Sequence, residues 1–174
     1  EFGVIYAGAQ KNMGPAGVTL VIIRDDLVGK NYRELPSMLD YETHVKNDSM
    51  FNTPPVFSVF VVSETLKWLK SLGGLDAMAV INERKAGKLY AEIERNPLFR
   101  SPVNAEDRSL MNVPFVFKED GMDDGAFLQF CDERGLQTLK GHRSVGGFRA
   151  SIYNAMPEAG VDALIDAMRE YETV

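Results

Sequence analysis

Blocks of apolar and polar residues follow one another along the chain, and the spacing of the apolar positions changes from block to block. Two β-type runs at residues 4–7 and 18–23 flank a turn rich in Gly and Pro, which predicts two neighbouring strands of one sheet. Residues 27–55 show no clear period and hold several Asn, Asp, Ser and Pro residues. They are interpreted as a long irregular connection, a kind of segment that often carries function.

Helical spacing of apolar residues returns after the pair Pro54 and Pro55. Apolar side chains occupy two faces of residues 56–72, so this helix is predicted to be buried. The stretch SLGG, which ends at Gly74, stops the helix and marks the predicted domain boundary. A longer amphipathic helix follows and ends at RNPLF, with these residues on or near one face: Met78, Ile81, Lys85, Leu89 and Ile93.

The remaining residues alternate between strand and helix patterns. Strands are predicted at residues 113–117, 136–139 and 148–153, and a helix near residues 123–133. A closing helix has Val161, Leu164, Ile165, Met168 and Tyr171 at helical spacing. The predicted fold class is therefore α/β, with residues 1–74 and 75–174 as the two domains.

Composition narrows the possible functions. The 174 residues are 45% hydrophobic, which is enough for a core, and 19 Lys and Arg against 25 Asp and Glu give a net charge of -6. Because the basic residues are scattered, a nucleic-acid surface is not expected. The lone Cys131 and the distant His44 and His142 argue against a disulfide or a metal cluster. No membrane span or signal peptide is recognisable, so a cytoplasmic protein is expected.

One lysine, Lys11, ends the first β-type run and precedes the turn in YAGAQKNMGPAG. An exposed surface lysine would explain it, because most lysines are solvated. The small residues around it favour another interpretation, since they let a flat ligand approach the backbone beside an amine nucleophile shielded from water. In SMFNTPP, Asn52 and Thr53 either cap the following helix or offer an amide and a hydroxyl to a phosphate.

A third candidate segment is KGHRSVGGFRAS, residues 140–151. A plain hairpin needs its glycines but not His142, Arg143 and Arg149 together. The planar guanidinium of arginine matches carboxylates and phosphates well. This segment therefore predicts a site for a small substrate with two or three negative charges.

Three long motifs, GVIYAGAQKNMGPAG, SMFNTPP and LKGHRSVGGFRASIYNAMP, resemble the phosphoserine aminotransferase family in family order. These enzymes are fold-type I aminotransferases of class V that depend on pyridoxal 5'-phosphate (PLP). The resemblance implies that residues 1–74 are the end of the PLP-binding large domain. Residues 75–174 are then the small C-terminal α/β domain.

The resemblance also implies residue roles at the cofactor. Lys11, in AQKN, would be the catalytic lysine that bonds to the cofactor and then moves a proton, and Gln10 would help to hold the cofactor phosphate. Asn52 and Thr53, in FNTPP, would reach the cofactor phosphate of the partner subunit in a homodimer.

At the substrate, the resemblance assigns the cations of the third motif. Arg149, in GGFRAS, would bind the α-carboxylate, and His142 with Arg143, in GHR, would bind the distal phosphate or carboxylate. The implied reaction, part of serine biosynthesis, moves the amino group of glutamate to 3-phosphohydroxypyruvate. Its products are 2-oxoglutarate and O-phosphoserine.

The chain departs from the family pattern at its start. In the family, the acidic partner of the cofactor nitrogen, a stacked aromatic ring and a glycine-rich phosphate turn all precede the lysine, whereas only ten residues precede Lys11 here. The sequence is therefore expected to be the C-terminal half of such an enzyme and inactive alone. Two alternatives stay open: a serine–glyoxylate or alanine–glyoxylate type of class V enzyme, and a non-catalytic assembly module.

Overall fold

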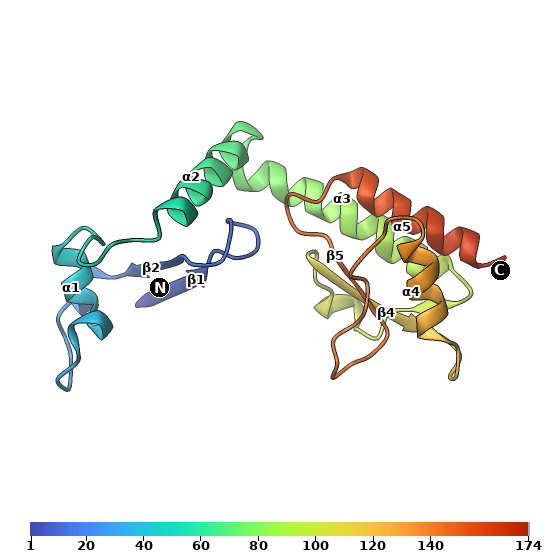
Figure 1. The fold of residues 1–174 in the computed structure, drawn as a ribbon, viewed down its shortest axis with the longest axis horizontal. Helices are drawn as coiled ribbons and strands as arrows, with labels where there is room; N and C mark the ends of the chain where they lie inside the picture. Colours follow the sequence, from blue (N-terminus) through green and yellow to red (C-terminus); the bar gives the residue numbers. More distant parts are fainter. Residues whose placement is uncertain (174) are drawn as a thin grey trace. The chain divides into compact units, whose positions relative to one another are not determined.

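The computed structural model describes residues 1–173. The chain divides into two compact units, Glu1–Leu72 and Gly73–Val174, both drawn in Figure 1. The predicted boundary at Gly74 falls beside this division, in the same pair of glycines. Gly73 has a left-handed φ of 104°, a conformation that glycine adopts at low cost.

Unit 1 begins with an antiparallel pair of strands, β1 (Val4–Gly8) and β2 (Thr19–Ile23), so the prediction of two neighbouring strands is confirmed. In the register of this pair, Tyr6 lies opposite Val21. The rest of the unit comprises two 3-10 turns, η1 (Asp25–Leu27) and η2 (Ser37–Leu39), and two helices, α1 (Tyr41–Lys46) and α2 (Val56–Ser71).

The interpretation of residues 27–55 as wholly irregular was wrong at α1. The Asp40 side chain accepts a hydrogen bond from the backbone N–H of Glu42 at 3.0 Å and so caps the start of this helix. An aspartate before a short polar helix is a capping signal in the sequence. The helix carries too few apolar residues for hydrophobic spacing to reveal it.

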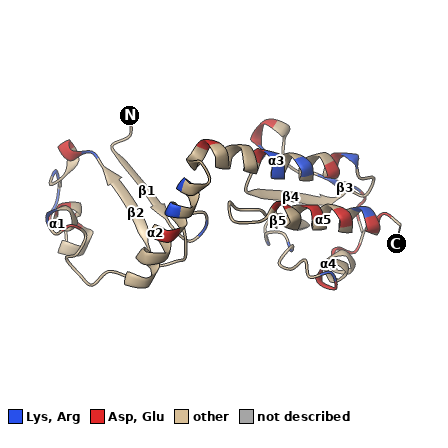
Figure 2. Ribbon diagram, turned by 90° about the horizontal axis from the view of Figure 1, so that it is seen from above, with Lys and Arg blue, Asp and Glu red and all other residues tan. Residues whose placement is uncertain are grey.

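Helix α2 forms where it was expected, but the prediction that it is buried was wrong for this chain. Val62 is its one buried residue, whereas Phe57 is 74% exposed and Phe60 is 58% exposed. Strands β1 and β2 likewise expose Tyr6 and Ile22. No charged residue interrupts either strand or the first half of α2, which are drawn in tan in Figure 2.

Unit 2 begins with the predicted amphipathic helix, α3 (Gly74–Arg95). The other elements are β3 (Phe99–Arg100), the 3-10 turn η3 (Ala105–Asp107), β4 (Asn112–Phe117), α4 (Asp124–Asp132), β5 (Phe148–Ser151) and α5 (Glu158–Tyr171). The strands form an antiparallel sheet in the order β3-β4-β5. The α/β prediction is confirmed, and β3 is a short strand that the sequence did not reveal.

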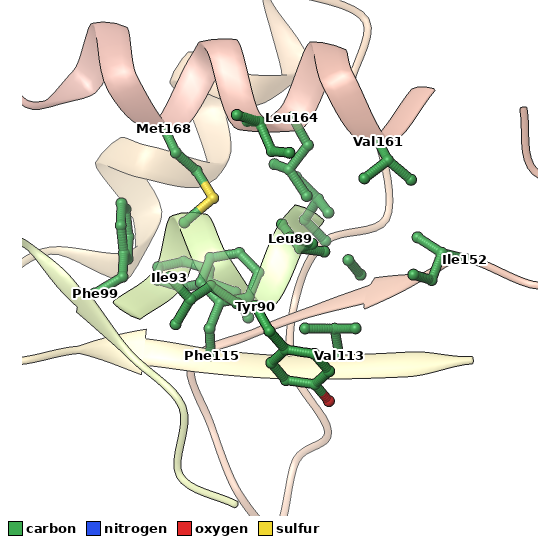
Figure 3. Close-up of a cluster of buried hydrophobic side chains, with 14 of the residues drawn as sticks. Leu89, Tyr90, Ile93, Phe99, Val113, Phe115, Ile152, Val161, Leu164 and Met168 are labelled. Carbon is green, nitrogen blue, oxygen red and sulfur yellow. The ribbon is translucent and has the colours of Figure 1, made fainter. Parts of the chain in front are cut away.

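The core of unit 2 lies between one face of this sheet and its helices. Alternate residues of β4 (Val113, Phe115 and Phe117) are buried, which is the period expected of a sheet covered on one face. In Figure 3 side chains of α5, such as Leu164, point toward Leu89 of α3 and toward β4. The other face of the sheet carries residues such as Arg149 and Ser151, which are half-buried.

The prediction of a strand at residues 136–139 was wrong. Gly135 and Thr138 have left-handed φ values of 76° and 61°, which interrupt an extended chain. The last residue of this segment, Leu139, accepts a hydrogen bond from the backbone N–H of Arg149 in β5 at 2.7 Å, and an isolated bridge pairs the next residue, Lys140, with Phe148. Leu139 is nevertheless buried. The apolar residues of this segment therefore indicated packing against the core and not a strand.

Candidate active site

The turn that carries Lys11 connects β1 to β2 and packs against α2. A Cβ added at Gly14 would lie 3.0 Å from Val62 Cγ2, and one added at Gly17 would lie 3.2 Å from Ser58 Oγ. Both glycines also have positive φ, at 154° and 110°. Small residues here therefore serve the close approach of the turn to α2, in addition to any role toward a ligand.

Lys11 and Gln10 are exposed in this turn. The expectation that the Lys11 amine is shielded from water is therefore wrong for unit 1 by itself. A Cβ at Gly8 would lie 2.9 Å from the Gln10 side-chain oxygen Oε1, so Gly8 leaves room for that amide. The turn thus presents an amine and an amide on adjacent residues at one end of the two-stranded sheet.

Asn52 and Thr53 lie in the connection between α1 and α2, and both are exposed. The Asn52 side-chain N–H₂ donates to the backbone carbonyl of Thr53 at 3.2 Å. The residue at the N-cap of α2 is Pro55, and no side chain caps the helix. The capping interpretation of Asn52 and Thr53 is therefore wrong, and both residues are exposed ahead of the helix.

In unit 2, glycines close the loop that carries His142 and Arg143. The Gly141 N–H donates to the Gly147 carbonyl at 2.8 Å. A Cβ at Gly141 would overlap the Gly146 carbonyl oxygen, which leaves no room for any other residue. The two ends of the loop 141–147 therefore lie close together. His142 and Arg143 are exposed in this loop.

Ser144 fixes the orientation of the His142 imidazole, a role that the sequence analysis missed. The Ser144 backbone N–H approaches His142 Nδ1 at 3.3 Å, and the Ser144 hydroxyl lies 2.7 Å from the same nitrogen. Because a backbone N–H can only donate, Nδ1 is the acceptor, and the proton of a neutral imidazole lies on Nε2. A serine two residues after a histidine in a turn is the signal that could have found this contact.

Arg149 lies on β5, just beyond this loop, opposite Pro114 of β4. Its Nε is buried and has no hydrogen-bond partner in the part of the chain that the structure describes. An unpaired buried donor costs about 1–3 kcal/mol, so such groups are rare and call for an explanation. Arg149 also lines a cavity of about 240 Å³ together with Ser151, Ile152 and Met156, and an oxyanion there could accept from this donor.

The predicted site residues thus form two groups. Unit 1 holds Gln10, Lys11, Asn52 and Thr53, and unit 2 brings His142 and Arg143 to the loop that leads into Arg149. The first group offers an amine, amides and a hydroxyl, which suit an aldehyde and a phosphate. The second offers three donors or cations, which suit a substrate with several negative charges.

Residues 1–173 hold neither a metal cluster nor a membrane helix. No group of three or more His, Cys, Asp or Glu side chains within this range could hold a metal ion. No helix described there is both long and apolar enough to cross a bilayer.

The family model for class-V aminotransferases matches residues 1–164. The chain belongs to this family. A phosphoserine aminotransferase of Azobacteroides pseudotrichonymphae is 54% identical to it over 175 residues, which cover 100% of this class-V chain and 49% of that protein.

Solved structures agree with this family membership. The phosphoserine aminotransferase of Bacillus circulans subsp. alkalophilus has a TM-score of 0.93 and 44% identity, with 99% of this chain and 48% of that chain covered. A PLP-bound phosphoserine aminotransferase of Trichomonas vaginalis has a TM-score of 0.89 and 46% identity, with 96% and 48% covered. The predicted fold type and family resemblance are confirmed, and PLP is the cofactor of the family.

This class-V chain spans about half the length of the curated relatives it matches. That it corresponds to their C-terminal half stays a prediction, which rests on the motif order described above.

Proposed function

We propose that this chain is the C-terminal half of a phosphoserine aminotransferase that acts as a cytoplasmic homodimer. The observation that carries the proposal is the identity of 54% to a protein of that name along the whole chain. The loop 141–147 of unit 2 supports it, because a substrate without a distal anion has no use for both His142 and Arg143.

The residues of unit 1 fit PLP by their chemistry. Lys11 supplies the primary amine that an aldehyde needs, and the residue is exposed in the turn. Gln10 supplies an amide to the cofactor phosphate, and Asn52 and Thr53 supply neutral donors to the phosphate of the partner subunit. When bound, the cofactor supplies an electron sink for bond breaking at the substrate Cα. Lys11 holds and moves the proton at that carbon through its Nζ.

The residues of unit 2 select and orient the substrate. Arg149 binds the α-carboxylate through its Nε, a donor that has no hydrogen-bond partner within residues 1–173. His142 directs its Nε2–H, and Arg143 its guanidinium, at the distal phosphate of O-phosphoserine or the side-chain carboxylate of glutamate. 3-Phosphohydroxypyruvate and 2-oxoglutarate carry the same anionic groups as these amino acids, so one site serves both halves of the reaction.

The experiment that tests the cofactor site is borohydride reduction in the presence of PLP, followed by intact mass analysis. It is done on the 174-residue chain alone and on the chain mixed with the N-terminal half of a relative. We expect a PLP adduct on Lys11 and transamination only in the mixture. Lys11→Arg should abolish both, whereas Lys30→Arg, an exposed lysine of the same unit, should abolish neither.

Substrate choice tests the rest of the proposal. In the reconstituted mixture, O-phosphoserine should be a better amino donor than serine, and His142→Ala with Arg143→Ala should remove that preference. Equal activity with both donors before mutation would instead favour a serine–glyoxylate or alanine–glyoxylate type of enzyme. A mixture that forms no Lys11 adduct would favour the assembly module.

A further inference from the structure

Lys85 is a fully buried cation in the middle of α3. Its side chain is 0% exposed, although it shares the helix face of apolar residues such as Leu89. Burial lowers the pKa of the Lys85 amine, while the carboxylate of Glu158 acts in the opposite direction. A lysine is almost never buried this far unless its donors are satisfied.

The donors of Lys85 are satisfied by one short segment of the chain. Its Nζ donates to the backbone carbonyls of Tyr153 at 2.9 Å, Met156 at 3.1 Å and Ile152 at 3.2 Å. All three acceptors lie between β5 and α5, where the backbone is neither strand nor helix. One ammonium group therefore fixes the path of residues 152–156.

A second polar residue of α3 contacts the same segment. Asn82, which is 4% exposed, donates from Nδ2 to the side-chain oxygen of Asn154 at 2.8 Å. Asn82 precedes Lys85 by one helical turn, so the two side chains lie along one face of α3. The segment 152–156 is thus held to this helix by polar contacts on both sides of Tyr153.

The fixed segment is continuous with the proposed carboxylate site. It begins three residues after Arg149, and Ile152 and Met156 line the same cavity as Arg149 and Ser151. A shift of Ile152 or Met156 would therefore change the walls around Arg149. An apolar side chain at position 85 would fill the space but could not bond three carbonyls.

We propose that Lys85 is a positioning residue, which fixes residues 152–156 and so holds the Arg149 guanidinium in the geometry that binds a substrate carboxylate. This inference rests on the proposed function, because it takes Arg149 as the carboxylate ligand. Lys85 itself touches no substrate.

The test compares Lys85→Met with Leu89→Ala in the 174-residue chain mixed with the N-terminal half of a relative and with PLP, as in the experiment above. Leu89→Ala is the matched control, because it creates a defect in the core of unit 2 at an apolar side chain, which makes no hydrogen bond to the carbonyls of residues 152–156. Binding of O-phosphoserine and of glutamate is followed by NMR at the Arg149 Nε–H and at the amides of residues 149–156. Unfolding midpoints are measured for each variant.

Lys85→Met should weaken binding of both ligands by about tenfold and shift the Arg149 Nε–H signal, since charge-assisted hydrogen bonds are lost. Leu89→Ala should lower the unfolding midpoint but change binding by less than about twofold. Similar losses of affinity in the two variants, or no loss in Lys85→Met, would overturn the inference.

If Lys85→Met does not fold, Asn82→Ala takes its place. A loss of affinity smaller than about tenfold in Asn82→Ala supports the inference, and no loss overturns it.

Chemical rescue distinguishes the effect of the Lys85 ammonium group from the effect of the volume that its side chain fills. Lys85→Cys in a Cys131→Ala background is alkylated with 2-bromoethylamine in denaturant and refolded, which restores an amine at nearly the original length. Recovery of affinity and of the Arg149 signal supports positioning, and recovery of stability alone contradicts it. A wild-type mixture that forms the Lys11 adduct but binds neither ligand would refute the carboxylate role of Arg149, and hence the inference, while the adduct would still support the cofactor half of the proposed function.

Discussion

A buried carboxylate, Glu92, joins α3 to α5 at the residue scale. It accepts from Arg95 Nη2 at 2.6 Å, from Arg169 Nε at 2.9 Å and from Asn96 Nδ2 at 3.2 Å, while it is only 2% exposed. Burial alone would raise the pKa of Glu92, but the hydrogen bonds from Arg95, Asn96 and Arg169 together lower it below the ordinary value. Ionised Glu92 therefore stabilises the folded state.

The pH dependence of stability follows from this direction. A lowered folded-state pKa gives stability that is present above the ordinary glutamate value of about 4.3 and is lost as the pH falls through the folded pKa. Glu92→Gln should lower the free energy of unfolding by about 1–3 kcal/mol at pH 7. When this free energy is measured by urea unfolding at several pH values, its decrease at acidic pH should be smaller in the variant. Glu83→Gln, an exposed position of the same helix, should leave this decrease unchanged, and an equal effect of both changes would contradict this account.

Two adjacent glycines of the loop 141–147 differ in what surrounds them. Both have left-handed φ, 76° at Gly146 and 58° at Gly147. A Cβ at Gly146 meets nothing within 4 Å, whereas one at Gly147 would lie 2.5 Å from Val116 Cγ1 and 2.8 Å from the Phe115 carbonyl oxygen. Gly146 therefore needs glycine for its backbone alone, and Gly147 needs it for space as well.

Alanine at these positions should consequently have unequal effects. Gly146→Ala should cost about 1 kcal/mol of unfolding free energy, from left-handed strain. Gly147→Ala should cost about 1–3 kcal/mol more, because overpacking is added to the strain. Urea unfolding of the two variants measures the difference, and equal midpoints would show that the loop moves to accommodate the methyl group.

At the element scale, the sequence predicted those helices and strands whose own residues determine them. The amphipathic spacing of α3 and α5 and the alternation of β4 follow from burial on one face, so all three were found. The strand predicted at residues 136–139 was wrong because Thr138 has a left-handed φ, which a threonine in a sequence does not indicate. For α2 the position was predictable, but its burial depends on surfaces outside its own residues. The position of the Lys85 amine could not be predicted from α3 alone either, since its acceptors lie about 70 residues away along the chain.

Helix α3 contains one glycine that has no structural requirement. Gly87 is exposed in the helix interior, and a Cβ there meets nothing within 4 Å. Since glycine is about 1 kcal/mol less favourable than alanine inside a helix, Gly87→Ala should raise the stability of unit 2 by about that amount. Thermal unfolding followed by circular dichroism measures the change, and an unchanged or lowered midpoint would mean that this position has a contact that the helix geometry does not show.

At the scale of the whole molecule, the two units bury very different amounts of apolar side chain. Within residues 1–72, Ala9 and Val62 are the buried hydrophobic residues. Unit 2 encloses a cluster of aromatic rings, in which Phe127 contacts Phe99 and Phe148 at centroid distances of 4.9 Å. A two-stranded sheet with so little covered surface has marginal stability, so the stability of the two units is expected to differ.

Hydrogen exchange should therefore separate the units. Backbone amides of β4 should exchange at least about a hundredfold more slowly than those of β1 and β2, because core strands open only on global unfolding of their unit. Phe127→Ala should cost unit 2 about 3 kcal/mol, which raises exchange in β4 and β5 by about a hundredfold. Exchange in β1 and β2 should not change, since Phe127 belongs to the core of the other unit. A parallel rise in both units would show that they unfold as one cooperative structure, and slow exchange in β1 and β2 would show that their exposed apolar faces are covered in solution.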